Sequence, residues 1–103
     1  MSKDKIYIFD TTLRDGAQTQ GVDFSIDDKL KIAESLGKLG VDYIEGGWPG
    51  ANPTDTEFFQ KKINTKNSIL TAFGMTKKTG RSAENDPGLS ALINSKAPAI
   101  CLV

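Results

Sequence analysis

The feature that most constrains the fold is the regular alternation of short apolar runs with segments patterned as helices. The apolar runs have the length and the β-branched or aromatic content of buried strands. Strands that alternate with helices predict a parallel sheet with right-handed crossovers. The expected strands are residues 6–9, 41–46, 68–74 and 99–103. The sequence therefore predicts an α/β chain in the order β-α-β-α-β-α-β.

The first expected helix begins at Ser25, whose hydroxyl can cap it while Asp28 occupies the capping-box position. Gly40 is placed to end this helix in a left-handed turn. We expect Lys29 and the other charged residues to face away from the apolar stripe. That stripe comprises Ile26, Leu30, Ala33 and Leu36.

Two further helices have weaker start signals. The second is expected to begin near Asn52 or Thr54, with Thr54 and Glu57 resembling a capping box. The third has Asp86 as its cap and Pro87 in its first position. Their expected apolar faces are Phe58, Phe59 and Ile63 in the second helix and Leu89, Leu92 and Ile93 in the third.

Composition excludes several classes of function. Thirteen basic and thirteen acidic residues cancel, so we expect neither a nucleic-acid footprint nor a membrane-surface patch. No apolar run is long enough to cross a bilayer, and residues 1–9 lack the core of a signal peptide. One cysteine cannot form an internal disulfide, which fits a reducing cytoplasm. The absence of histidine excludes a histidine base or histidine metal ligand within this chain.

Polar groups gather where the first expected strand ends. Arg14 and Asp15 follow the strand directly, and Gly16 lets the backbone turn there. Binding and catalytic groups of parallel α/β folds collect at this end of the strands. From spacing alone, a solvated ion pair between Arg14 and Asp15 is the simpler interpretation. Asp10, also at a strand end, is a candidate for a supporting position.

Three separated motifs resemble one enzyme family. They are Leu-Arg-Asp-Gly-Ala-Gln at residues 13–18, followed after ten intervening residues by Lys29; Glu-Gly-Gly-Trp-Pro-Gly at 45–50; and Gly-Arg-Ser-Ala-Glu-Asn-Asp-Pro-Gly at 80–88. Together they resemble the isopropylmalate, homocitrate and citramalate synthases, a metal-dependent TIM-barrel family that includes 3-hydroxy-3-methylglutaryl-CoA lyase. The bacterial citramalate synthases are the most similar group. The resemblance extends from about Lys5 to Val103.

The resemblance implies a partial (β/α)8 barrel. A complete TIM barrel needs about 250 residues, whereas this chain has 103 and stops inside an apolar strand. We therefore interpret residues 1–103 as the amino-terminal part of one catalytic barrel domain, with three βα units and the start of strand four.

The resemblance also implies roles for individual residues. Asp15 would bind a divalent metal, Mg or Mn, together with two histidines beyond Val103; otherwise it pairs with Arg14 or caps the loop. Arg14 would polarise the keto oxygen and stabilise the oxyanion. Gln18 would orient the keto acid, with ordinary loop hydrogen bonding as the alternative. We interpret Lys29 as structural.

Glu45 and Phe73 complete the candidate set. Glu45 stands at the end of the second expected strand, and we expect it to pair with Arg14 and to hold the guanidinium or take part in proton transfer. The alternative is a buried partner without a chemical step. Phe73 could line the substrate pocket, although ordinary core packing explains it as well. Trp48 could cover the substrate or simply fold over its loop, and Cys101 is expected in the core.

Basic residues in a later loop are a further candidate for coenzyme A phosphates, although a solvated loop explains them more simply. They are Lys77, Lys78 and Arg81.

The family resemblance implies condensation of acetyl-CoA with a 2-oxo acid. For a citramalate synthase the acid is pyruvate and the product feeds isoleucine synthesis, in a cytoplasmic enzyme that works as a homodimer. The alternatives are an isopropylmalate or homocitrate synthase, a related lyase, or an inert fragment.

Overall fold

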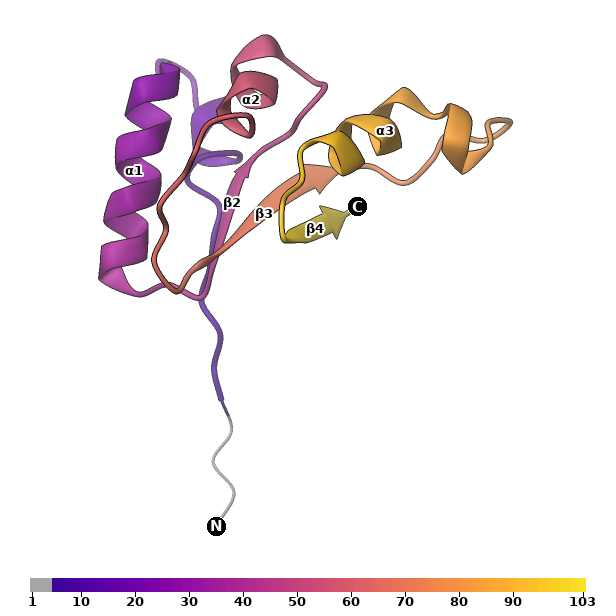
Figure 1. Ribbon diagram of the computed structural model, residues 1–103. Helices are drawn as coiled ribbons and strands as arrows, with labels where there is room; N and C mark the ends of the chain where they lie inside the picture. Colours follow the sequence, from indigo (N-terminus) through magenta and orange to yellow (C-terminus); the bar gives the residue numbers. More distant parts are fainter. Residues whose placement is uncertain (1–4) are drawn as a thin grey trace.

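Four parallel strands form one sheet in the computed structural model, which describes residues 5–103 (Figure 1). The strands are β1 (Phe9–Asp10), β2 (Tyr43–Gly47), β3 (Ile69–Gly74) and β4 (Ala99–Leu102), and they lie side by side in chain order. The connecting helices are α1 (Ile26–Leu39), α2 (Pro53–Phe58) and α3 (Pro87–Asn94). The alternation, the parallel direction and the neighbour order are those of the first half of a TIM barrel, so the predicted α/β class is confirmed. Residues 1–4, which the sequence analysis included in the domain and in the signal-peptide test, lie outside the described residues.

The expected signals at the ends of two helices are confirmed. Ser25 and Asp28 form a reciprocal capping box at α1, and Gly40 ends that helix in the left-handed region at φ 92°. At α3, the Asp86 carboxylate accepts hydrogen bonds from the backbone N–H groups of Gly88 and Leu89. It also accepts one from Lys78 N–H, which lowers the pKa of Asp86 and ties the preceding loop to the helix.

Other expectations about the helices are wrong. The cap of α2 is Asn52, which accepts from the backbone N–H of Asp55, and the Thr54–Glu57 box does not form. This helix ends at Phe58, so Ile63 lies in the following loop. In α3, Ile93 is 72% exposed and is therefore not part of the buried face.

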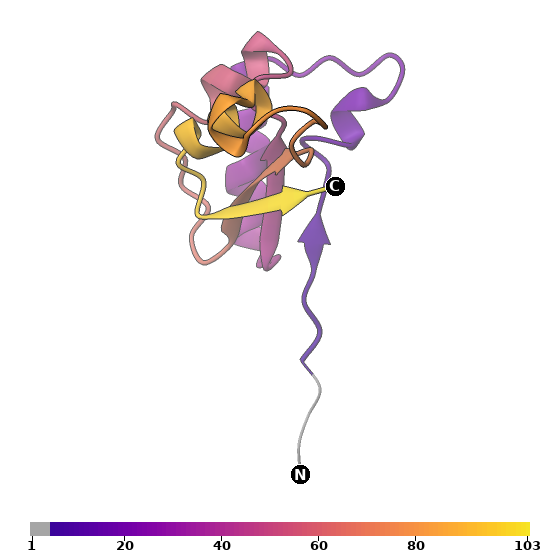
Figure 2. The same cartoon turned by 90° about the vertical axis from the view of Figure 1, so that its right-hand side faces the viewer.

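The first strand is shorter and more exposed than expected. Ile6, Tyr7 and Ile8 precede the strand, and Ile6 is 84% exposed. The reason is register: β2 begins at Tyr43, which is the partner of Phe9, so earlier residues extend past the end of their neighbour. Figures 1 and 2 show this segment running away from the body of the molecule.

The hydrophobic core lies between the helices and one face of the sheet. Ile44 of β2 and Ala72 of β3 point into it, and each of the three helices contributes to it. Its helical members are Ala33, Phe58 and Leu92. Successive side chains of a strand alternate between faces, so Glu45 and Phe73 are directed to the opposite face. None of the described helices is long and apolar enough to span a membrane.

Candidate active site

A buried ion pair stands at the carboxyl ends of the first two strands. Arg14 Nε donates a hydrogen bond to Glu45 Oε1 at 2.5 Å. The Glu45 side chain is 1% exposed, whereas that of Arg14 is 20% exposed. The expected pairing of these two residues is confirmed. A guanidinium held on one edge by a carboxylate keeps its remaining donors free for a second acceptor.

The Phe73 ring packs against the Arg14 guanidinium. The Arg14 Cζ atom lies 4.1 Å from the centroid of the Phe73 ring, which is cation–π geometry. Trp48 meets the same ring edge-on, with centroids 5.1 Å apart. Phe73 is buried, but it lies on the sheet face opposite the helices and outside the main core cluster, so ordinary packing in that core does not explain it. Its part in lining a substrate pocket stays a prediction.

Cys101 lies on the same face of the sheet as Phe73, its register partner. It is half-buried and not in the core cluster, so the expectation of a plain core residue is wrong. Burial raises the pKa of the Cys101 thiol, and the nearby Glu45 carboxylate raises it further, while Arg14 opposes the rise. The thiol therefore reports on the charge around the Arg14–Glu45 pair.

The two polar residues that follow Arg14 have different positions. Asp15 is exposed, and its carboxylate makes no hydrogen bond or ion pair with any residue of the described part of the chain. The alternative of an Arg14–Asp15 pair or a loop cap is therefore wrong. Gln18 borders a cavity of about 260 Å³ that Arg14, Lys29 and Trp48 also line. Asp10 instead caps its own turn by accepting from Thr12.

We tested whether these residues fit a divalent cation. A hard cation prefers carboxylate oxygen, and Asp15 offers one that is free and exposed. Glu45 is committed to Arg14, and no group of three potential ligands exists within residues 5–103. The described residues do not by themselves form a complete metal site.

A second ion pair, which the sequence patterns did not predict, is also buried. Lys29 is 1% exposed and donates to Asp55 Oδ1, so the expectation that Lys29 faces away from the core is wrong. Burial lowers the pKa of the Lys29 amine, and Asp55 opposes that shift. Helical spacing contained the signal: Lys29 follows Ile26 by three residues and precedes Ala33 by four, which places it on the apolar stripe.

The basic residues proposed for coenzyme A phosphates do not join this site. Lys77, Lys78 and Arg81 are exposed in the loop between β3 and α3.

Comparison with known proteins identifies the family. A protein-family model described as HMGL-like matches residues 5–85. The (R)-citramalate synthase of Aquifex aeolicus is 52% identical over 96% of this chain, and that of Streptomyces coelicolor is 50% identical over 97%. The 2-isopropylmalate synthase of Microcystis aeruginosa is 55% identical over 58% of the chain. The chain spans 19% of the length of each of these two citramalate synthases and 11% of that of the isopropylmalate synthase. These matches confirm the resemblance seen in the three motifs, and the chain belongs to the HMGL-like family.

Proposed function

We propose that this chain is part of an acyltransferase that condenses acetyl-CoA with pyruvate, giving (R)-citramalate and coenzyme A for isoleucine synthesis. The observation that carries the proposal is the match to (R)-citramalate synthases along 96% and 97% of the chain. The Arg14–Glu45 pair supports it, because a fixed, partly exposed guanidinium suits a reaction in which a keto oxygen gains negative charge.

The proposed reaction forms one carbon–carbon bond. A base outside this chain removes a methyl proton from acetyl-CoA, and the resulting enolate attacks the keto carbon of pyruvate. The keto oxygen becomes an alkoxide that takes up a proton. Water then hydrolyses the thioester and releases coenzyme A.

Arg14 and Glu45 act at the developing alkoxide. The Nε edge of Arg14 is held by Glu45, so its terminal N–H groups are the donors for the oxygen. We propose that Glu45 keeps the guanidinium in place or takes part in proton transfer. Removing such a pre-organised donor lowers kcat by about 10²–10³-fold.

Gln18 and Phe73 are proposed to bind the 2-oxo acid. Gln18 lines the cavity beside Arg14 and carries an amide that can bond to a carboxylate. Phe73 presents an aromatic surface beneath the guanidinium. Asp15 would contribute one carboxylate ligand to Mg or Mn, whose bound form would polarise the keto group.

A 2-isopropylmalate synthase is the second candidate, because such an enzyme is 55% identical over 60 residues of this chain. Both candidates use acetyl-CoA and a 2-oxo acid. We further propose a cytoplasmic homodimer without nucleic-acid or membrane partners.

The test is release of coenzyme A from acetyl-CoA and Mn, measured on the longest protein that the gene encodes. Pyruvate, 2-oxoisovalerate and 2-oxoglutarate are offered separately. We expect release with pyruvate, lost in Asp15→Ala and retained in Asp27→Ala, which removes an exposed aspartate from the first turn of α1. Release with 2-oxoisovalerate alone would support the second candidate. No release with any acid would overturn the proposal.

A further inference from the structure

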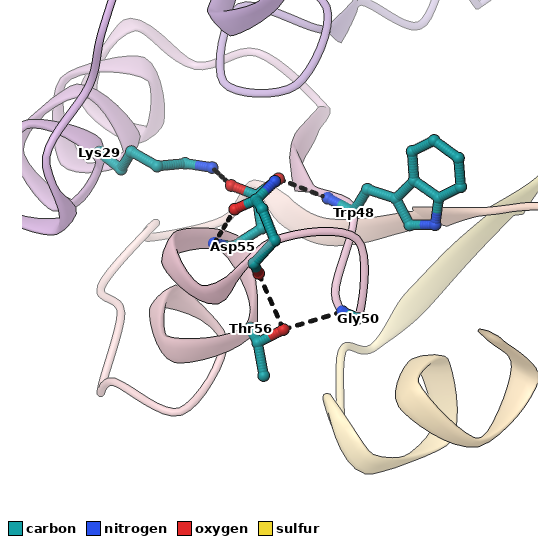
Figure 3. Close-up of polar contacts among 6 residues, drawn as sticks. Lys29, Trp48, Gly50, Asp55 and Thr56 are labelled. Carbon is teal, nitrogen blue, oxygen red and sulfur yellow. Dashed lines mark hydrogen bonds and ion pairs between the residues drawn. The ribbon is translucent and has the colours of Figure 1, made fainter. Parts of the chain in front are cut away.

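Asp55 joins helix α1 to the loop that follows β2 (Figure 3). Its Oδ1 atom accepts from the Lys29 ammonium group. Its Oδ2 atom accepts from the backbone N–H of Trp48 at 2.9 Å and from Asn52 Nδ2 at 3.2 Å. Both carboxylate oxygens are therefore used, one on the helix and the other on the loop.

A second contact from α2 holds the same loop. Thr56 Oγ1 accepts from Gly50 N–H at 2.8 Å and donates to the carbonyl of Asn52 at 3.0 Å (Figure 3). Loop residues 47–52 are thus tied at both ends to the first turn of α2. The loop has little freedom while Asp55 keeps its partners.

The close packing around the ion pair explains the glycine that begins the loop. A Cβ atom on Gly47 would lie 2.7 Å from Asp55 Cγ and 2.9 Å from Lys29 Nζ. Gly47 also has a φ of 154°. A side chain at this position would therefore separate the ion pair from the loop backbone.

The ion pair is a poor device for stability alone. Desolvating a lysine and an aspartate costs several kcal/mol per ion, and apolar replacements of buried pairs are often as stable. Lys29 is 1% exposed, and its Nζ atom lies 4.9 Å from the Phe58 ring centroid, where an apolar side chain would pack well. We therefore look for a role of the Lys29–Asp55 pair in positioning neighbouring groups.

A continuous set of contacts leads from the pair to the active site. Asp55 holds the Trp48 backbone, and the Trp48 ring packs edge-on against Phe73. The Phe73 ring in turn lies beneath the Arg14 guanidinium. Displacement of Trp48 would remove the support on one side of Phe73 and loosen Arg14 from Glu45.

We propose that Lys29 and Asp55 are positioning residues, whose ion pair holds Trp48 against Phe73 and so keeps Arg14 on Glu45. The importance of these contacts for catalysis rests on the proposed function, but the contacts themselves do not. It can be tested without substrate, so failure of the coenzyme A assay and failure of this inference are distinguishable.

The chain offers two probes of its own. Trp48 is its one tryptophan and Cys101 its one cysteine. Acrylamide quenching of Trp48 fluorescence reports on the exposure of the loop. The rate at which the Cys101 thiol reacts with an uncharged thiol reagent, measured as a function of pH, reports on the charges of Arg14 and Glu45. The measurements are made on this chain in sulfate buffer, because sulfate favours the folded state.

The variants are Lys29→Met, Asp55→Asn and the double variant that combines them. Only the double variant removes both charges and so leaves no unpaired buried charge. The matched control is Lys61→Met, which removes a lysine from an exposed 3.6 Å pair with Glu57. Arg14→Gln gives the effect of losing the guanidinium completely.

We expect Lys29→Met to increase quenching of Trp48 and to slow the Cys101 reaction. Loss of Arg14 from its place removes the positive charge that opposes the raised thiol pKa, so that pKa rises further and the thiolate fraction below it falls. The slowing should approach that of Arg14→Gln, and Lys61→Met should change neither probe. If Lys29→Met does not fold, the double variant decides, because its site carries no stranded charge. Folded variants with wild-type quenching and a wild-type Cys101 profile would overturn the proposal.

Discussion

Replacing Gly46 by alanine tests how closely α2 packs on β2. A Cβ atom at this position would lie 2.7 Å from Phe58 Cε2, whereas ordinary contacts begin at 3.4 Å. The ring must therefore withdraw by about 0.7 Å in a packed core, where small displacements are felt. The added Cβ atom would also lie 3.1 Å from Leu70 Cδ1 and 3.2 Å from Phe59 Cζ, so these side chains must give way as well. We expect a loss of about 1–3 kcal/mol in the free energy of unfolding, the usual cost of overpacking.

A second substitution shows whether the Phe58 ring is the cause. Phe58→Leu alone should cost about 1–2 kcal/mol, less than the 3–5 kcal/mol of a Phe→Ala change. In that background Gly46→Ala should cost less than in wild type, with a coupling energy of at least about 0.5 kcal/mol. Part of the cost remains, because Leu70 and Phe59 are still close.

Urea unfolding followed by circular dichroism measures these energies. We expect a lower midpoint with an unchanged slope. Gly16→Ala is the control, because its Cβ would meet Thr12 Cγ2 at 3.5 Å, an ordinary contact. A neutral Gly46→Ala, or costs that simply add in the double variant, would refute the packing argument.

Two pH effects follow from the charged groups. Burial lowers the pKa of Lys29 from 10.5, so between the lowered value and 10.5 the unfolded chain holds one more proton than the folded chain. The free energy of unfolding of the wild type should therefore increase with pH in this range, and Lys29→Met should remove that increase. Urea titrations that give the wild type and Lys29→Met the same pH dependence would contradict this. Hydrogen bonds from Lys78 and Leu89 N–H hold the pKa of Asp86 below 3.8, so its contribution is present above 3.8 and lost as pH falls through the folded value. Asp86→Asn should flatten the acid limb of a circular dichroism titration, and an unaltered limb would count against this cap.

Local signals in the sequence were sufficient for much of the fold. Ser25, Gly40 and Asp86 act at the helix ends through residues within four positions of themselves, so these capping roles could be predicted from spacing, whereas the bond from Lys78 to Asp86 could not. The Arg14–Glu45 pair was predicted from the family resemblance, in which the matching glutamate lies near the arginine, together with the common edge to which parallel strands bring their carboxyl ends.

Long-range partners could not be predicted in the same way. Lys29 is charged, and only the distant Asp55 makes its burial possible. The exposure of Ile6 depends on where β2 begins, which apolar content does not reveal. The start of α2 stayed open between Asn52 and Thr54 because both residues suit a helix start, and the choice depends on the path of the preceding loop.

The strand β2 has one irregularity in its pairing with β3. Glu45 pairs with Thr71 and Gly47 with Ala72, so Gly46 is an extra residue in the ladder. As a result, both glycines meet atoms of the helical layer while Glu45 alone is directed to the site. For laboratory evolution this separates two kinds of position. Exchange of residue 45 would change the face that carries Arg14, whereas added atoms at residues 46 and 47 would press on the helical layer. A library aimed at the site face should therefore keep residues 46 and 47 unchanged.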